Sequence, residues 1–564
     1  MMSVPYLVRL LPALALGLFA LDAQAQSFRV QCPSSTTMHP TETSGAYTGP
    51  VTVSSALTAS SGATVPYVRN GGGIKCQQIS GGDGYATMGD GTQTYLFGFG
   101  PLSGLADIVN GLPGTEVASV FNTPNLNSAG VIADIFVGAP VDQNAQALKT
   151  GYAFNGAVGL VPDQSANTYD ANGNVVTNCG DPANLNNPAC LGGHVDPRLI
   201  MDVGVMNANQ PAPLIAIDED DELFLTLTNV GMIMRPDLFE QHTVHFHGYP
   251  NASSFYDGVP DASIAISIGG SFSYYYLAPD AGTYFWHCHI SPPEHLQMGM
   301  VGQLYVRPRQ NRVASGGSLW NALADATGHG QQSDLRTACH TEGILCSTPV
   351  PPQNTVTRAA TGGYAYNDGD GSTHYDVEYP IQIHGFDPNF HFVGMTFNPE
   401  SFTDMKDKYF LLNGRSYPDT VAPGTMTTQS SDGTLHASQP LPTIINIPAG
   451  GRALLRISDL DVSEYQTLAS LGIPMTVVGL NARLLRDLAG NNLAYNTNSI
   501  TLAGGESLDV ILDASDTTKY TAGQTFYLYS PNLDHLSNDA ENFGGLMTEI
   551  HICTSVDPST KACI

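Results

Sequence analysis

The stretch that decides the fold reads "WHCHISPPEHLQMGM" and covers residues 286–300. It places Cys288 between His287 and His289, with His295 and two methionines downstream. Residues i and i+2 of a β-strand point to the same face. His287 and His289 are therefore predicted to face one way, and Cys288 the other.

The sequence around this stretch predicts short β-strands. The segment "SIGGSFSYYYLAPDAGTYFWHCHI" (267–290) gives two aromatic-rich strands around a Pro-Asp-Ala-Gly turn. The segment "PLIAIDEDDELFLTLTNVG" (213–231) alternates apolar and polar residues around an acidic turn. Short strands, frequent turn residues and few helical patterns indicate an all-β protein built from antiparallel β-sandwiches of Greek-key type.

The second half of the chain echoes the first. "QHTVHFHG" (241–248) aligns with "YQTLASLG" (465–472), and "TYFWHCHI" (283–290) aligns with "TFYLYSPN" (525–532). This alignment predicts a duplicated domain. It replaces the histidines and the cysteine of the first copy by residues that are poor metal ligands: Gln466, Ala469, Leu471, Tyr529, Ser530 and Pro531.

Composition and charge exclude several classes of function. The 564-residue chain has a formal net charge of −29, which disfavours nucleic acids and anionic substrates. Residues 1–25 have a basic residue, an apolar run and an Ala-Gln-Ala site, as in a signal peptide. We expect a periplasmic or secreted protein without a membrane span.

Nine cysteines in an exported chain indicate disulfides, with one thiol left over. Proximity in the sequence suggests four pairs: Cys32 with Cys76, Cys179 with Cys190, Cys339 with Cys346, and Cys553 with Cys563. Cys288 is then predicted to be the free thiol.

The residues of this stretch suit a type 1 copper site. Such a site uses two imidazoles, one thiolate and a weak axial methionine. Cys288, His295 and Met300 offer three of these ligands from one loop, and His242 offers the fourth. Met298 is the alternative axial ligand.

Two alternating histidine pairs predict a second metal site. His245 and His247 form one pair, and His287 and His289 form the other. Both pairs are expected to face away from Cys288, so that the peptide bonds beside Cys288 join the two sites.

The motifs "HTVHFHG" and "HCHISPPEHLQMGM" resemble those of the multicopper oxidases, a family built from cupredoxin domains. The resemblance implies that His242, Cys288, His295 and Met300 are the type 1 ligands. It implies His245 as a type 2 ligand, and His247, His287 and His289 as type 3 ligands. The copper nitrite reductases also share a two-domain build, but they have Asp where this chain has His245.

The resemblance implies two cupredoxin-like domains. We expect an irregular N-terminal arm over 26–75, a copper-binding domain over 76–308, a linker over 309–374 and a second domain without copper ligands over 375–564.

These features predict an exported, multicopper oxidase-like enzyme that oxidises a phenol or a reduced metal ion at the type 1 copper. Catalysis is assigned to His242, Cys288 and His295. Because the second domain lacks histidine pairs, a second copy or a partner subunit would complete the outer copper site. The alternative is a periplasmic cupredoxin that binds copper or transfers electrons without reducing oxygen.

Several other residues have weaker signals. Asp257, Asp261 and Glu294 are candidates for guiding a reducing metal ion, against a role as solvated loop carboxylates. His384 and His391 are interpreted as structural rather than as metal ligands.

Overall fold

The computed structural model describes residues 72–123 and 197–564, apart from 238–239, 249–252, 279, 324–354, 395–400, 430–434, 488 and 540. It also describes short segments between residues 30 and 69 and between 154 and 195. The expected signal peptide lies outside the described residues. No helix in the described part of the chain is long and apolar enough to span a membrane.

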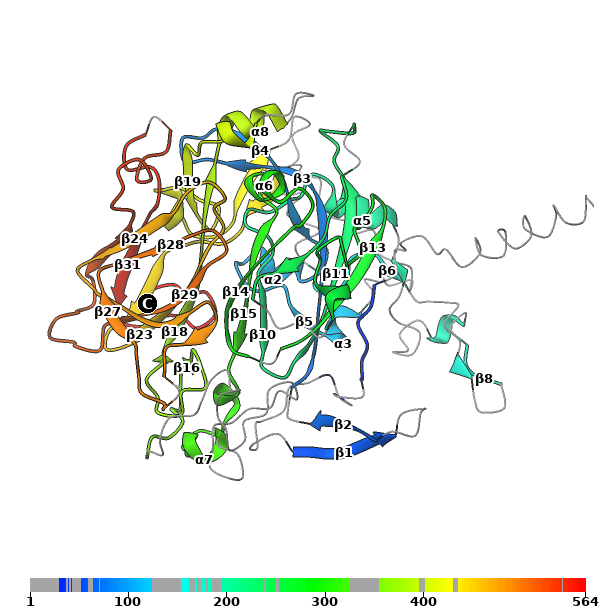
Figure 1. Ribbon diagram of the computed structural model, residues 1–564, viewed down its shortest axis with the longest axis horizontal. Coiled ribbons are helices and arrows are strands. Elements are labelled where there is room, and N and C mark those ends of the chain that lie inside the picture. Colours follow the sequence, from blue (N-terminus) through cyan, green and yellow to red (C-terminus); the bar gives the residue numbers. More distant parts are fainter. Residues whose placement is uncertain are drawn as a thin grey trace, which may run out of the picture.

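Two β-sandwiches lie side by side, the first blue to green and the second yellow to red (Figure 1). The first sandwich has one sheet in the order β13-β11-β3-β4, with β5 on β3, and another in the order β10-β15-β14-β12. Its strands are β3 (Ile74–Thr87), β4 (Gln93–Pro101), β5 (Glu116–Val117), β10 (Ile215–Asp218), β11 (Glu222–Gly231), β12 (His245–Phe246), β13 (Ser271–Leu277), β14 (Gly282–His287) and β15 (Val301–Arg307). The all-β prediction is confirmed.

The second sandwich repeats this topology. Its sheets run β19-β18-β23-β29-β25-β26, with β27 on β25, and β22-β31-β30-β24-β28. Its strands are β18 (Val377–Phe386), β19 (Tyr409–Leu412), β22 (Ile445–Pro448), β23 (Arg452–Asp459), β24 (Gln466–Leu471), β25 (Met475–Leu480), β26 (Arg483–Leu484), β27 (Tyr495–Thr497), β28 (Ser499–Leu502), β29 (Ser507–Asp513), β30 (Thr525–Tyr529) and β31 (Met547–Cys553).

The two sandwiches share a common set of strand pairings, to which the second adds the strands β25, β26, β27 and β28. The pairs β3–β11 and β10–β15 are parallel, and so are β18–β23 and β22–β31. The sheets are therefore mixed rather than purely antiparallel. His245 lies opposite His287 in the first sandwich, and Ala469 lies opposite Tyr529 in the second. These are the pairs that the sequence alignment of the two halves equates.

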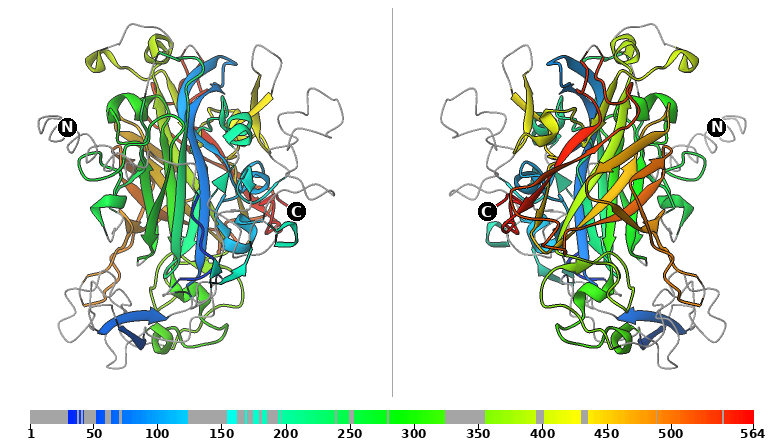
Figure 2. Two further views of the ribbon diagram at one scale, coloured as in Figure 1. Left: turned by 90° about the vertical axis from the view of Figure 1, so that its right-hand side faces the viewer. Right: turned by 90° about the vertical axis from the view of Figure 1, so that its left-hand side faces the viewer.

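Polar bonds across a buried interface join the sandwiches, which lie one in front of the other in both views of Figure 2. The Thr283 hydroxyl donates to Asp509 Oδ1 (2.7 Å), and Gln303 Nε2 donates to the Arg456 carbonyl (2.9 Å). β14 and β15 of the first sandwich therefore pack against β23 and β29 of the second.

Two segments are more ordered than predicted. The arm expected to be irregular contains an antiparallel hairpin of β1 (Thr52–Thr58) and β2 (Thr64–Arg69), because Thr- and Val-rich segments favour strands despite the Ser and Gly around them. The expected linker begins with Arg309, whose buried guanidinium pairs with Asp220 at 2.7 Å.

The described disulfides agree with the sequence prediction. Cys32 bonds to Cys76 and Cys553 bonds to Cys563, and Cys288 is a buried free thiol. The other two predicted pairs lie outside the described residues.

Candidate metal centre

Three predicted ligands meet inside the first sandwich. One donor atom from each of His242, Cys288 and His295 lies within 4.8 Å of the others. His242 comes from the segment before β12, Cys288 directly follows β14, and His295 lies in α6 (Pro292–Gln297). All three side chains have no solvent exposure. The site is therefore a closed cluster in the core.

Hydrogen bonds hold the Cys288 sulfur in place. It lies 3.3 Å from His295 Nδ1 and accepts from the Thr243 backbone N–H at 3.5 Å. Burial alone would raise the pKa of the Cys288 thiol, but His295 and His242 bring it well below its usual range. Burial opposes the charge on His295, yet Cys288 and Glu240 raise the pKa of His295 to about 10. These interactions favour the thiolate form of Cys288, which is the form that binds metals.

His242 is the residue of this cluster whose ring nitrogens are both left unpaired among the described residues. Neither of its ring nitrogens has a hydrogen-bond partner in the described part of the chain, although the residue is fully buried. Buried polar atoms are rarely left unpaired because each costs about 1–3 kcal/mol. Two imidazoles and a thiolate are the donor set of a type 1 copper, so this group fits that metal.

The backbone places Met300 beside this cluster. The Met300 N–H donates to the His295 carbonyl (2.8 Å), and the Cys288 N–H donates to the Met300 carbonyl (3.1 Å). Met298 is also buried, but its N–H bonds to Glu294 in the turn of α6. The backbone bonds favour Met300 as the axial ligand, which stays a prediction.

The alternating histidines form a second group on the other side of Cys288. His245, His247 and His287 bring one ring nitrogen each within 4.8 Å of one another. The His289 ring lies 5.0 Å from His245 and 5.6 Å from His287 between ring centroids. His289 therefore borders this group without being part of its tightest set.

Backbone carbonyls orient these rings. His245 Nδ1 lies 2.7 Å from the Asp257 carbonyl, and His287 Nδ1 lies 2.6 Å from the Cys288 carbonyl. The His247 ring bonds to the backbone of Gly505, which belongs to the second domain. A carbonyl can only accept, so each ring holds its proton there and leaves Nε2 free for a metal.

The free nitrogens face each other. His247 Nε2 lies 2.7 Å from His287 Nε2. Burial, together with the neighbouring histidines, lowers the pKa of His247 to about 4 and that of His287 well below its usual range. Neutral rings with their protons on Nδ1 would set two lone pairs against each other, which a bound cation would relieve. These residues therefore fit a metal as well.

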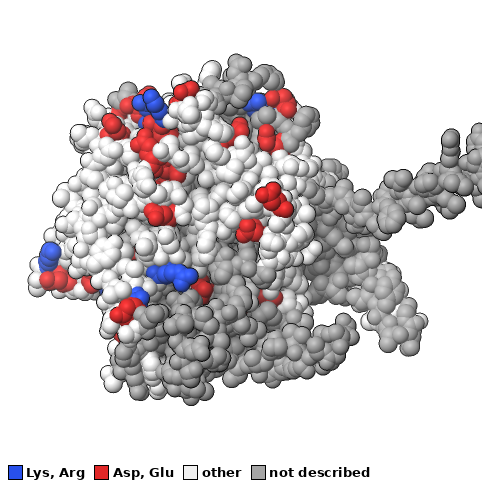
Figure 3. Space-filling model, in the orientation of Figure 1, with Lys and Arg blue, Asp and Glu red and all other residues white. Residues whose placement is uncertain are grey.

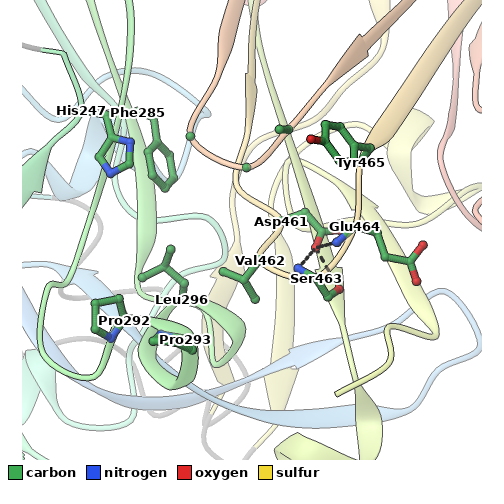
Figure 4. A pocket seen from close by; sticks show the side chains of 13 residues that line it. His247, Phe285, Pro292, Pro293, Leu296, Asp461, Val462, Ser463, Glu464 and Tyr465 are labelled. Carbon is green, nitrogen blue, oxygen red and sulfur yellow. Dashed lines mark hydrogen bonds between the residues drawn. The ribbon is translucent and has the colours of Figure 1, made fainter. Parts of the chain in front are cut away.

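A cavity of about 410 Å³ opens onto this outer group (Figure 4). His247, Phe285 and Leu296 line it from the first domain, and the segments 461–465 and 503–505 line it from the second. It gives a route from solvent to His247.

Sequence reasoning missed two contributors, Glu240 and Gly505, and gave Asp257 a different role. Glu240 Oε2 lies 3.6 Å from His295 Nε2. Asp261, a sequence candidate for guiding a reducing metal ion, is exposed on its loop. Asp257 contributes its backbone carbonyl to His245, not only a charge. Gly505 reaches His247 from the other domain. Of these residues, only Glu240 had a local signal in the sequence, because it stands two residues before His242.

His384 and His391 do not join either group. His384 Nε2 bonds to the Leu296 carbonyl (2.9 Å), and His391 Nε2 bonds to the Gln297 carbonyl (2.8 Å). Both rings therefore fix the end of α6 beside His295, as the structural interpretation predicts.

Residues 195–311 match the family model for multicopper oxidases. A laccase, abr2, of Aspergillus fumigatus is 33% identical over 109 residues, which is 19% of this chain and 17% of the laccase. Multicopper oxidase MmcO of Mycobacterium tuberculosis is 35% identical over 80 residues, 14% of each chain. The match spans about a sixth of the length of the first of these relatives. A blue copper oxidase structure from Nitrosomonas europaea has 20% identity and a TM-score of 0.38, covering 61% of this chain and 77% of that one.

Proposed function

We propose that this chain, whose residues 195–311 match the multicopper oxidase family model, is an exported copper oxidoreductase that oxidises a phenol or a reduced metal ion. Bound copper would supply the one-electron chemistry, taking electrons from the reductant and delivering them toward oxygen. The observation that carries the proposal is the pair of donor groups on opposite sides of one cysteine. His242, Cys288 and His295 would hold the type 1 copper, and the outer histidines would hold the rest.

Cys288 is the covalent link between the groups. Its side chain lies in the inner group, while its carbonyl accepts from His287 Nδ1 in the outer group. His287 and His289 are its direct neighbours in the chain. Few atoms therefore separate the two predicted copper sites, as an electron path requires.

The charge of the protein favours cationic or neutral reductants. Acidic side chains are spread over the face drawn in Figure 3, where basic side chains are few. With a net charge of −29, the protein attracts reduced metal ions and repels anions. Glu240, whose side chain is 26% exposed beside His295, is the carboxylate best placed to receive such a reductant.

The outer group requires a partner in this proposal. Within the described residues, metal-ligand groups occur only in the first domain. A second copy of the chain, or another subunit, would supply the missing histidines next to the cavity at His247. Activity per chain should then fall on dilution as the assembly dissociates.

Copper analysis combined with oxygen uptake tests the proposal. A copper-loaded protein that is blue, contains copper beyond the type 1 ion and consumes oxygen with a phenol or reduced metal supports it. A blue chain that binds no further copper and leaves oxygen untouched would instead favour a periplasmic electron-transfer protein. A colourless, copper-loaded chain would contradict both functions.

A further inference from the structure

The second domain keeps the backbone bonds that frame the inner site of the first. The Ser530 N–H donates to the Leu546 carbonyl (2.8 Å), as Cys288 does to Met300 (3.1 Å). The Leu546 N–H donates to the His535 carbonyl (2.9 Å), as Met300 does to His295 (2.8 Å). Ser530, His535 and Leu546 therefore occupy the positions of Cys288, His295 and Met300.

Strand register supplies the fourth position. Ala469 pairs with Tyr529 as His245 pairs with His287. Three residues before Ala469 stands Gln466, as His242 stands three residues before His245. Gln466, like His242, is fully buried.

The surroundings of His535 also repeat those of His295. His535 Nε2 lies 2.8 Å from Glu464 Oε2, as His295 Nε2 lies 3.6 Å from Glu240 Oε2. Glu240 stands two residues before His242, and Glu464 stands two residues before Gln466. The His535 ring stacks on Phe410 as the His295 ring packs edge-on against Phe97. This likeness extends beyond the residues that the sequence alignment equates.

Three polar atoms in this frame lack partners among the described residues. They are Gln466 Oε1, Ser530 Oγ and His535 Nδ1. All three residues are at most 3% exposed. Such orphaned atoms are costly in a core, and here they coincide with three ligand positions of the first domain.

We infer that Gln466, Ser530, His535 and Leu546 form a second, converted type 1 site, and that its frame binds copper once a thiolate and a second imidazole are restored. As the chain stands, a hydroxyl and an amide oxygen replace the soft thiolate and an imidazole, so the frame lacks the donors that copper prefers. The inference uses the ligand assignment of the proposed function but not its oxidase activity.

The test is made in a Cys288→Ser chain, which removes the first blue site. Gln466→His, Ser530→Cys and Leu546→Met are added together, and the change at Leu546 nearly conserves volume. After loading with cupric ion, we expect a thiolate-to-copper absorption band and one additional copper per chain over the Cys288→Ser parent. A matched control replaces Ser530→Cys by Ser458→Cys, a buried serine of the same domain outside the frame, and should show neither gain.

Circular dichroism and thermal unfolding establish that each variant is folded. A folded triple variant without extra copper, or with no more colour than the Ser458→Cys control, would overturn the inference. If the triple variant does not fold, the double variant Gln466→His and Ser530→Cys is made in the same Cys288→Ser chain. It is tested for the same absorption band and additional copper. If this double variant also fails to fold, the inference is overturned, because a retained frame has room for both new side chains. An oxygen-inert wild type combined with a blue triple variant would refute the proposed oxidase function while supporting this site.

Discussion

Nε2 of His247 lies 2.7 Å from Nε2 of His287, although both rings bond to backbone atoms through their other side. The partner of His247 is Gly505, in the turn between β28 and β29 of the second domain. The second domain has no histidine pair of its own at the equivalent positions, yet it orients a histidine of the first. The outer site is thus built across the interface within one chain.

Replacing Gly505 should disable the outer site selectively. A Cβ at Gly505 would lie 2.8 Å from His247 Nδ1, at a φ of +89°. We expect Gly505→Ala to lower copper content to about the single type 1 ion per chain and oxygen uptake by at least about tenfold while the blue band remains, because His242, Cys288 and His295 are untouched.

The control is Gly523→Ala, which has a similar φ of +91° but open space around its Cβ. Both variants should pay a similar backbone cost of about 1–2 kcal/mol in unfolding free energy. Full copper content and oxygen uptake in Gly505→Ala would show that His247 does not depend on this contact.

Substitutions on either side of the central strand should separate colour from turnover. Cys288→Ser should abolish the blue band and leave the fold, because Ser nearly preserves the volume of the buried side chain. His289→Ala should keep the band and lower oxygen uptake by at least about a hundredfold, since its ring borders the outer group. Absorption spectra and an oxygen electrode measure the two effects. A His289→Ala chain with normal turnover would remove His289 from the site.

The sequence predicted those features that depend on local periodicity. The alternation of His287, Cys288 and His289 along one strand was enough to place the thiol and the imidazoles on opposite sides. The alignment of the two halves also predicted the register in which Ala469 pairs with Tyr529. These relations follow from the two-residue period of a strand.

Contacts through the backbone and across domains could not be predicted in this way. Asp257 and Gly505 hold their histidines by backbone atoms, which any residue possesses, so their sequence carries little signal. Gly505 is also far from His247 in the chain. The β1–β2 hairpin was missed because the Ser- and Gly-rich composition around it outweighed two short runs of Thr and Val.

Glu378 is expected to stabilise the interface between the domains. Its carboxylate bonds to Arg307 of the first domain (2.6 Å) and to Arg456 of the second (2.9 Å). Burial alone would raise the pKa of Glu378, but the two guanidinium groups lower this pKa to about 2.

Glu378→Gln should therefore leave the buried Arg456 and the partly exposed Arg307 less well compensated and lower the free energy of unfolding by up to about 3 kcal/mol. Asp513→Asn, at the partly exposed Arg452 pair (3.3 Å), should cost less than about 1 kcal/mol. Urea unfolding of both variants measures the difference. Equal losses would mean that the buried network contributes no more than a surface pair.

His391 should make stability depend on pH. Burial lowers its pKa from 6.5 to about 4 against the opposing effect of the Tyr95 and Gln297 carbonyls, which favours a neutral ring in the folded chain at neutral pH. Between these values the unfolded chain binds a proton that the folded chain does not. Its contribution to stability is therefore intact above pH 6.5 and declines as the pH falls toward 4, by at most about 1.4 kcal/mol per pH unit.

His391→Gln removes this titration while keeping one hydrogen-bond donor for the Gln297 or Tyr95 carbonyl. At neutral pH the variant should be less stable by about 0.5–1.5 kcal/mol, because Gln lacks the ring that packs against Phe386. As the pH falls toward 4, wild type should lose stability faster than the variant, so the two unfolding free energies converge or cross. Urea titrations at a series of pH values give both slopes, and parallel slopes would show that His391 is protonated as easily in the folded chain as in the unfolded one.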